Sequence, residues 1–236
     1  METQGPQPEK IRSMFGEIAG SYDLANTVLS GGVHHLWRSS LVRWSGTREG
    51  QAVLDCATGT GDLAIEFKKT VGPMGRVVGT DFCAEMLEPA PSKAIRLGLD
   101  IEFSQADVTK LPFRDEEFNV SSISFGIRNV GDPKRGLAEL ARVVRPGGVV
   151  MILEFGQPNT PGVKQAYDLY SRHVLPVIGG MITGRREAYR YLQDSSAQFP
   201  CREEFVELMM STGRFASCEF RQLTFGIAYM YKGIVK

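Results

Sequence analysis

The apolar residues beyond position 52 form short runs of strand length, separated by longer segments of helical length. Short, continuously apolar runs are typical of strands that are buried on both faces of a sheet. We predict strands at 52–55, 76–80, 101–105, 118–124 and 149–154. Helices are expected near 61–69, 84–97 and 133–144, the last of them ended by a turn at 145–148 that contains Pro-Gly-Gly. This alternation predicts a doubly wound, Rossmann-like α/β sheet.

Three further segments lie outside this alternation. Residues 1–50 precede the first strand with apolar residues at helical spacing, and a segment at about 160–212 is rich in aromatic residues and interrupted by proline and glycine. We expect an N-terminal helical lid over 1–50 and a helical insertion within a domain that spans 51–236, with one structural domain overall. The tail, 217–236, is expected to close the sheet as a β-hairpin with its turn at Gly226.

Composition narrows the choice of partners. The 236 residues include 27 basic side chains, 27 acidic side chains and four cysteines. A balanced charge disfavours a nucleic-acid partner, which calls for a basic surface. Cysteines without paired spacing predict neither disulfides nor a metal site, and they indicate a reducing, cytoplasmic compartment. No apolar run reaches the roughly 18 residues of a membrane span, and no feature predicts an oligomeric state.

A loop of small residues follows the first strand. The strand ends in Asp55, and the loop contains Gly59, Thr60 and Gly61. Glycines at the start of a helix let backbone amides approach a ligand closely. Because Gly59-x-Gly61-x-x-Ala64 also fits a dinucleotide fingerprint, the loop alone leaves open a nicotinamide cofactor, and also a tight turn without a ligand.

Acidic residues also follow the next two strands. Asp81 is placed to accept hydrogen bonds from ribose hydroxyls, and Asp107 to accept one from an adenine amino group. Phe82 and Val108 would hold the adenine ring between them. One such aspartate is most often a turn former or helix cap, whereas three at successive strand ends indicate a nucleoside site. Asp55 favours the cationic amino end of S-adenosyl-L-methionine over a pyrophosphate, so we predict that cofactor.

Several segments outside the glycine loop carry a family likeness. They are Tyr22-Asp23-Leu24-Ala25-Asn26 with Ser30 to His34 and Trp37, Leu111-Pro112-Phe113, Phe125-Gly126-Ile127-Arg128-Asn129-Val130, Arg142 to Phe155, and Tyr189-Arg190-Tyr191-Leu192. Together they resemble the UbiE/MenG-type class I methyltransferases, which C-methylate demethylmenaquinol and polyprenyl benzoquinols. The likeness runs from about Lys10 to the tail. Ala25, Arg145 and Gly156 depart from the family's usual residues and bear on subfamily, meaning naphthoquinol or benzoquinol use.

The resemblance implies a fold, a cofactor and a substrate class. The fold would be a class I methyltransferase sheet, with the N-terminal helices and the insertion forming a substrate lid. S-adenosyl-L-methionine would be held at four family ligand positions and by the backbone of Val108. Those four positions are Thr60, Asp81, Asp107 and Ser124. The acceptor would be the ring of a reduced, prenylated quinone precursor. A nicotinamide oxidoreductase and a non-catalytic small-molecule binder are the alternatives.

Methyl transfer to a ring carbon of a hydroquinol is helped by groups that stabilise a developing phenolate. Arg128 and Asn129 follow the fourth strand, at the edge where doubly wound sheets bind ligands. We predict that Arg128 stabilises the phenolate by charge, Asn129 donates a hydrogen bond to its oxygen, and Tyr22 from the lid closes a water network. Water is expected to take the proton, since arginine is always protonated. The structural alternative is that Arg128 pairs with a nearby carboxylate.

A prenylated acceptor has to be collected from a membrane surface. We therefore expect peripheral contact with the inner face of the cytoplasmic membrane, through apolar lid residues exposed near an entrance. The candidates are Leu175, Val177, Ile178, Met181 and Ile182, with an ordinary core as the alternative. Of the adjacent His34 and His35, one is expected to pack and the other to be solvated.

Overall fold

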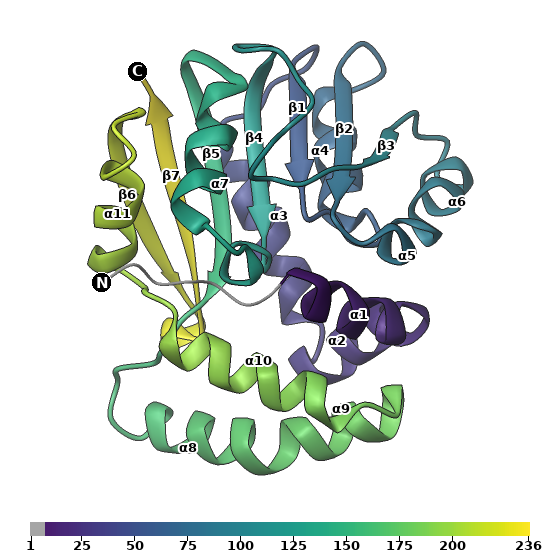
Figure 1. The fold of residues 1–236 in the computed structure, drawn as a ribbon, viewed down its shortest axis with the longest axis vertical. Coiled ribbons are helices and arrows are strands. Elements are labelled where there is room, and N and C mark those ends of the chain that lie inside the picture. The colour runs from purple at the N-terminus through teal and green to yellow at the C-terminus, as the bar shows by residue number, and fades with distance from the viewer. Residues whose placement is uncertain (1–7) are drawn as a thin grey trace.

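A seven-stranded sheet forms the centre of the computed structural model, which describes residues 8–236. Its strands are β1 (Ala52–Cys56), β2 (Arg76–Asp81), β3 (Glu102–Gln105), β4 (Phe118–Ser124), β5 (Val144–Phe155), β6 (Phe215–Leu223) and β7 (Ala228–Val235). The spatial order is β3-β2-β1-β4-β5-β7-β6; β1 to β5 run parallel, and β7 is antiparallel to β5 and β6 (Figure 1). The predicted doubly wound sheet and closing hairpin are confirmed.

Helices cover both faces of the sheet. α3 (Val33–Ser45) and α4 (Asp62–Val71) place Leu41 and Phe67 in a core with the β1 residue Val53. α7 (Pro133–Arg142) and α11 (Glu203–Met210) bury Leu140 and Phe205 in a second core. The short helices α5 (Ala84–Leu87) and α6 (Pro89–Arg96) pack at the β2–β3 edge. Each apolar residue of the inner strands is therefore shielded on one side or the other, as their continuously apolar sequences require.

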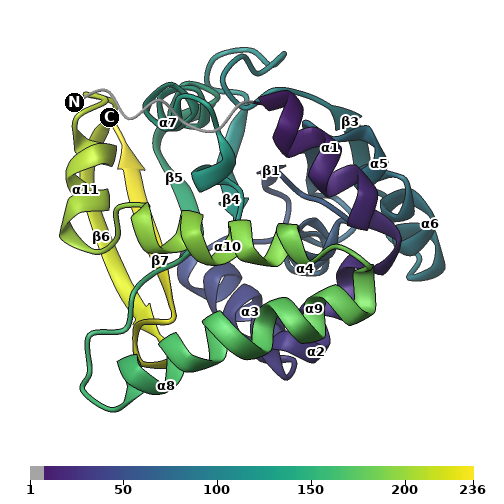
Figure 2. The same ribbon diagram turned by 60° about the horizontal axis from the view of Figure 1, so that its bottom comes forward.

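A further helical layer lies across the carboxyl ends of the parallel strands (Figures 1 and 2). Its members are α1 (Pro8–Ile18), η1 (Ala19–Ser21), α2 (Tyr22–Ser30), α8 (Val163–Leu169), the π-helical turn η3 (Tyr170–Val174), α9 (Leu175–Thr183) and α10 (Arg186–Gln198). Ile18, Ala25 and Tyr189 form its own small apolar core. Residues 1–7 of the predicted lid lie outside the described residues. At the other end of the predicted insertion, α11 leaves this layer and packs on the sheet against α7 and β6.

Two local predictions are wrong, and proline explains both. The helix expected over 84–97 is divided at Glu88, because Pro89 has no amide hydrogen to donate and begins the new helix α6. The Pro-Gly-Gly segment expected to stop the helix near 144 lies inside β5, since α7 ends at Arg142. The register between β4 and β5 shifts there, from Phe118 opposite Val144 to Val120 opposite Val149, so the proline sits in a bulge where no ladder bond is lost.

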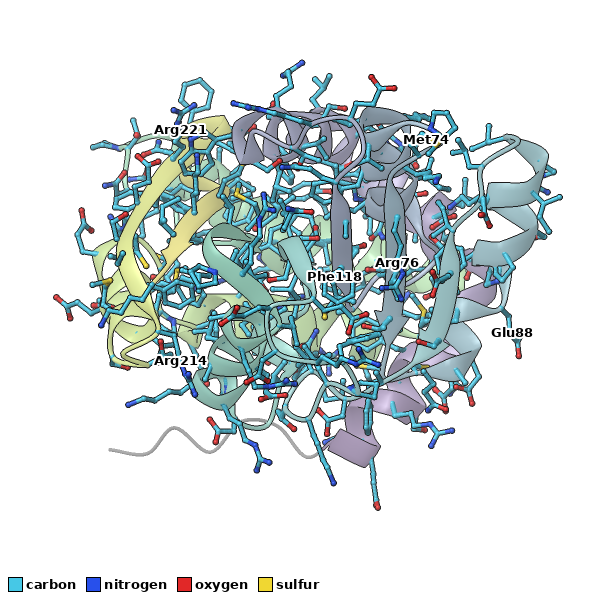
Figure 3. All side chains as sticks on the ribbon, turned by 90° about the horizontal axis from the view of Figure 1, so that it is seen from above. Met74, Arg76, Glu88, Phe118, Arg214 and Arg221 are labelled. Atoms are coloured by element: carbon cyan, nitrogen blue, oxygen red, sulfur yellow. The ribbon has the colours of Figure 1, made fainter. Side chains whose placement is uncertain are left out.

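Ionic contacts cover the opposite end of the sheet, where the parallel strands begin (Figure 3). Arg76 pairs with Glu102 at 2.8 Å and with Glu117 at 2.7 Å, and its guanidinium lies 5.5 Å from the ring centroid of Phe118. The two cavities described in the next section lie at the other end, toward the helical layer. Within residues 8–236, no helix is both long enough and apolar enough to cross a membrane.

Candidate active site

The loops after β1 and β4 meet at the point where the strand order of the sheet reverses. This is where open α/β sheets bind ligands, because the neighbouring crossovers leave on opposite faces. Ala57 has a φ of 48° and Phe125 a φ of 56°, left-handed values that are costly for residues with a side chain. A Cβ on Gly126 would meet the Cβ of Ala57 at 2.5 Å. Backbone strain and close approach both single out this crevice.

A cavity of about 260 Å³, here called the loop cavity, opens between these loops and the ends of β2 and β3. Six of the nine predicted cofactor residues line it: Gly59, Asp81, Phe82, Asp107, Val108 and Ser124. The Oγ atom of Ser124 is buried and has no hydrogen-bond partner among residues 8–236. A buried hydroxyl without a partner in such a wall is a group available to a ligand.

Asp81 connects the loop cavity to the glycine loop. Its Oδ2 accepts a hydrogen bond from the amide of Gly59 at 2.8 Å, and its Oδ1 accepts one from the amide of Cys83 at 2.9 Å. Burial raises the pKa of this carboxyl, and the two amides oppose the rise. Asp107 has its Oδ1 in a turn, where it accepts bonds from the amide and hydroxyl of Thr109, each at 2.8 Å. Both aspartates thus shape the backbone as well as the cavity.

The other three predicted cofactor residues, Asp55, Thr60 and Gly61, are not among the residues that line the loop cavity. Asp55 is 1% exposed and accepts hydrogen bonds from Thr58 at 2.6 Å and Ser122 at 2.7 Å. Burial raises its pKa to about 6, and these two hydroxyls limit the rise. Gly61 has a φ of 85° and forms the N-cap of α4. Asp55 and Gly61 therefore act on the shape of the loop.

Thr60 faces the helical lid. Its hydroxyl donates to Oδ1 of Asp23 in α2 at 2.6 Å, and Lys93 donates to Oδ2 of Asp23 at 2.7 Å. Lys93 also reaches Oδ1 of Asp62 at 2.5 Å, while Arg38 donates to Oδ2 of Asp62 at 2.7 Å. This network joins the lid helix α2, together with α3 and α6, to the first turn of α4.

A larger cavity of about 370 Å³, here called the lid cavity, lies between the helical layer and the sheet. Its wall is mostly apolar and aromatic, with contributions from α1, α2, α3, α8, α10 and the turn η4 (Thr224–Gly226). The charged or titratable side chains in the wall include His34, Arg38 and Arg128. Phe15, Tyr22 and Phe125 line both cavities, so the two spaces meet at these rings.

Arg128 is held rigidly in the wall of the lid cavity. It is 7% exposed, and its Nη1 donates to Glu154 at 2.5 Å and to the carbonyl of Phe125 at 2.8 Å. The guanidinium lies 5.4 Å from the ring centroid of Phe155. Its Nε is buried and finds no acceptor in the part of the chain that the structure describes. The carboxylate pairing foreseen as an alternative is thus present, and a donor remains free.

Asn129 and Tyr22 lie near the junction of the cavities. Asn129 lines the loop cavity, and its Oδ1 accepts a hydrogen bond at 3.0 Å from the hydroxyl of Tyr191, which lines the lid cavity. Burial raises the pKa of Tyr22, so its hydroxyl stays protonated at neutral pH. All three predicted catalytic residues therefore lie around one junction.

Comparison with known proteins settles the class of this site. The model of the ubiE/COQ5 methyltransferase family matches residues 3–235, which is nearly the whole chain. The chain belongs to the ubiE/COQ5 methyltransferase family. A relative named ubiquinone/menaquinone biosynthesis C-methyltransferase UbiE, from Bdellovibrio bacteriovorus, is 62% identical over 236 residues and covers all of both chains. Another of that name, from Teredinibacter turnerae, is 40% identical and covers 95% of this chain and 91% of its own.

Solved structures show the same fold. A SAM-dependent methyltransferase from Thermotoga maritima has a TM-score of 0.66 at 19% identity, with 95% of this chain and 99% of that one covered. A phosphoethanolamine N-methyltransferase 2 from Haemonchus contortus, in complex with S-adenosyl-L-methionine, has a TM-score of 0.61 at 14% identity, with 84% of this chain and 52% of that one covered. The predicted class I methyltransferase fold is confirmed.

Membership of the ubiE/COQ5 family also confirms the predicted enzyme class and cofactor. The chain is a methyltransferase that uses S-adenosyl-L-methionine. The nicotinamide oxidoreductase and the non-catalytic binder, which the glycine fingerprint had left open, are not favoured.

Several residues of the ubiE/COQ5 site escaped the sequence prediction. Phe15, Phe125 and Tyr191 border the cavities, and Glu154 holds Arg128. Glu154 carried a usable signal, because it lies near the carboxyl end of a parallel strand, as Asp55 does. Phe125 and Tyr191 lie in segments that carry the family likeness, whereas Phe15 carried no signal, since its spacing is that of an ordinary helix core.

Predictions for the lid residues have mixed outcomes. Leu175 is buried in the wall of the lid cavity, so its predicted exposure is wrong. Val177 is 44% exposed and Met181 is 77% exposed, whereas Ile178 and Ile182 are half-buried. His34 is buried and His35 is exposed, as expected for neighbours on a helix.

Proposed function

We propose that this methyltransferase transfers a methyl group from S-adenosyl-L-methionine to a ring carbon of a reduced, prenylated quinone precursor. The loop cavity would hold the cofactor and the lid cavity the acceptor ring. The observation that carries this assignment is that the two cavities meet at Phe15, Tyr22 and Phe125. A methyl donor and its acceptor have to be brought into contact, with water kept out, for an in-line transfer.

The residues of the loop cavity suit the cofactor. The hydroxyl of Ser124, which has no partner among residues 8–236, can bond to the cofactor, and Phe82 and Val108 offer apolar surfaces for the adenine. Asp81 keeps lone pairs for ribose hydroxyls beyond the two amides it already accepts. When bound, S-adenosyl-L-methionine supplies an electrophilic methyl group on a sulfonium. Asp55, Thr60 and Gly61 would support the cofactor through the conformation of the loop.

The lid cavity suits a hydroquinol ring with an apolar tail. Its polar surface is confined to a few groups, among them the buried Nε of Arg128, a donor with no acceptor in the described part of the chain. A positive, preorganised donor beside a phenolic oxygen favours the phenolate and so raises electron density at the ortho carbon. Tyr22, kept protonated by burial, can donate to the same oxygen. Asn129 would fix the junction through its bond with Tyr191.

The acceptor's tail implies contact with a lipid surface. Exposed apolar residues occur on α9, where Val177 and Met181 are one helical turn apart. The neighbouring helix α2 exposes Leu24 and Val28, which are also one turn apart. Such a surface can bind a bilayer peripherally. We expect Met181→Glu to weaken flotation with vesicles that carry the acceptor. Met74→Glu, an equally exposed position at the far end of the sheet (Figure 3), should not. Equal flotation of both variants would contradict this contact.

A methyl-transfer assay with the purified protein tests the function. Radiolabelled S-adenosyl-L-methionine is supplied with demethylmenaquinol or with a polyprenyl methoxybenzoquinol, each kept reduced. The expected result is transfer of label to a ring carbon of at least one of them, and the ratio of kcat/KM values assigns the subfamily. Oxidised quinones serve as controls and should accept no label, because they lack the hydroxyl that activates the ring. Absence of transfer to both hydroquinols would overturn the proposal.

A further inference from the structure

Replacing a ring hydrogen by a methyl group releases one proton, so an acceptor site of the proposed function needs a group that takes it. The lid cavity is mostly apolar, and few of its lining groups can serve. A guanidinium such as that of Arg128 is always protonated, and a neutral tyrosine such as Tyr22 already holds its proton. His34 is the lining residue whose side chain can be neutral and basic at neutral pH.

The position of His34 suits this task. It is the second residue of α3, it is 4% exposed, and it lines the lid cavity. Its Nδ1 lies 2.6 Å from the hydroxyl oxygen of Ser30, the last residue of α2, which lines the same cavity. Either partner can be the donor in this bond, and in the tautomer in which Nδ1–H donates to Ser30 the lone pair of Nε2 is left to accept a proton.

Burial, more than the charges around it, keeps His34 neutral. Burial lowers its pKa to about 4, and the positive Arg38 and the neighbouring His35 act in the same direction. Asp62 and Asp23 oppose them. At pH 7 the imidazole is therefore unprotonated, so its lone pair is available, and a proton that it takes up is readily passed on.

A path for a proton to solvent lies directly beside His34. The rings of His34 and the exposed His35 have centroids 3.9 Å apart. A ring nitrogen of each and a carboxylate oxygen of Asp62 lie within 4.8 Å of one another. Because Arg38 and Lys93 already hold the two oxygens of Asp62, we assign no metal to this cluster. A proton on His34 can leave along this side without crossing the apolar cavity.

We propose that Nε2 of His34 accepts the proton of the acceptor's ring hydroxyl during methyl transfer, in place of the water expected from the sequence. As the ring carbon forms its bond to the methyl group, the O–H bond breaks, its electron pair enters the ring system and the proton passes to Nε2. The hydrogen on the methylated carbon then leaves as a proton, the oxygen is protonated again and the ring becomes aromatic. One proton in total reaches solvent, which balances the positive charge that the methyl donor loses.

The test compares His34→Ala and His34→Gln with His173→Ala, a control that alters the chain's exposed histidine in the lid layer. We expect the two His34 variants to lower kcat about 100-fold, as loss of a general base usually does, and His173→Ala to leave it unchanged. Binding of the demethylated cofactor product, measured by calorimetry, should be the same in all. His34→Gln keeps a bond to Ser30 and guards against misfolding of His34→Ala.

Chemical rescue separates proton transfer from packing. Added imidazole should raise kcat of His34→Ala about tenfold or more. The rescued rate should decrease at pH values below the pKa of free imidazole, which is near that of an unperturbed histidine, about 6.5. A kcat for His34→Gln close to that of the unmodified enzyme, or a His34→Ala enzyme that imidazole leaves unchanged, would overturn the inference. An unmodified enzyme that methylates neither hydroquinol would instead overturn the proposed function.

Discussion

Arg128 combines a structural and a proposed chemical role in one side chain. Glu154 and the carbonyl of Phe125 hold one edge of the guanidinium, while Nε remains free within the cavity wall. Removing one partner of a buried ion pair usually costs about 3 to 5 kcal/mol, because the other charge stays buried and unpaired. Variants at this position therefore have to be designed so that loss of activity is not confused with loss of folding.

We expect Arg128→Lys to lower kcat tenfold or more, equivalent to about 1.4 kcal/mol, with little change in cofactor affinity. Lysine keeps the charge but loses the planar fork that pairs with Glu154 and presents Nε. The double variant Arg128→Met/Glu154→Gln removes both charges of this buried pair, so it should fold and bind the cofactor while remaining inactive. Unaltered kcat in Arg128→Lys and in the double variant would remove Arg128 from the chemistry.

Asp81 is expected to be the most sensitive cofactor residue. Asp81→Ala removes an acceptor for ribose hydroxyls and also the bond that holds the amide of Gly59, so calorimetry should show no measurable binding of S-adenosyl-L-methionine. Asp107→Ala should weaken binding less, because its turn bonds with Thr109 are local. Asp100→Ala, an exposed aspartate outside both cavities, is the control. Normal binding by Asp81→Ala would show that the ribose lies elsewhere.

At the scale of elements, the site depends on how closely the loops after β1 and β4 approach each other. Strands β1 and β4 are neighbours in the sheet, with Cys56 opposite Ile123, so their following loops have little room. Because Gly126 has no side chain, the Cβ of Ala57 can occupy the space beside it. Neither loop could take its shape alone, since each limits the other.

Gly126→Ala should lower cofactor affinity and melting temperature together. The added Cβ would meet that of Ala57 at 2.5 Å, which forces the two loops apart. Gly20→Ala is a matched control, because a Cβ there has nothing within 4 Å. Calorimetry and thermal unfolding of both variants check the expectation, and a Gly126→Ala protein indistinguishable from Gly20→Ala would contradict it.

At the scale of the molecule, stability and pH are linked through buried groups of the site. The unfolded chain protonates His34 near its ordinary pKa of about 6.5, whereas the folded chain does so only at about 4. Between these values the unfolded state binds more protons, so stability falls as the pH is lowered through this window. Asp55, whose pKa is raised to about 6, has the opposite effect over part of the same window.

The contribution of His34 to the pH dependence of stability can be isolated by comparing two proteins. His34→Gln cannot titrate, so its melting temperature should fall less than that of the unmodified protein between pH 6.5 and pH 4.5, while Asp55 contributes equally to both. Thermal unfolding followed by circular dichroism across this range gives the comparison. Parallel curves for the two proteins would mean that His34 is not the buried neutral group described here.

Local patterns in the sequence were enough to predict the sheet and the chemical character of its ligand edge. Apolar runs of strand length predict buried parallel strands because side-chain burial is a local property of each strand. Parallel strands all end at the edge of the sheet where ligands bind. An aspartate that follows such a strand therefore lies at this edge, which is why Asp81 and Asp107 could be named in advance. The family motifs added Ser124 and Arg128, which also lie in cavity walls.

Which side chains meet in the site depends on contacts between distant parts of the chain. Trp37 bonds to Thr224 across 187 residues, Tyr191 to Asn129 across 62, and Thr60 to Asp23 across 37. No local pattern encodes such pairs, because each depends on how whole helices dock on the sheet. The same holds for His34, whose neutral state comes first from burial by the surrounding elements and then from Arg38 and His35 on its own helix. Periodicity fixes the elements, and packing across the chain fixes the site.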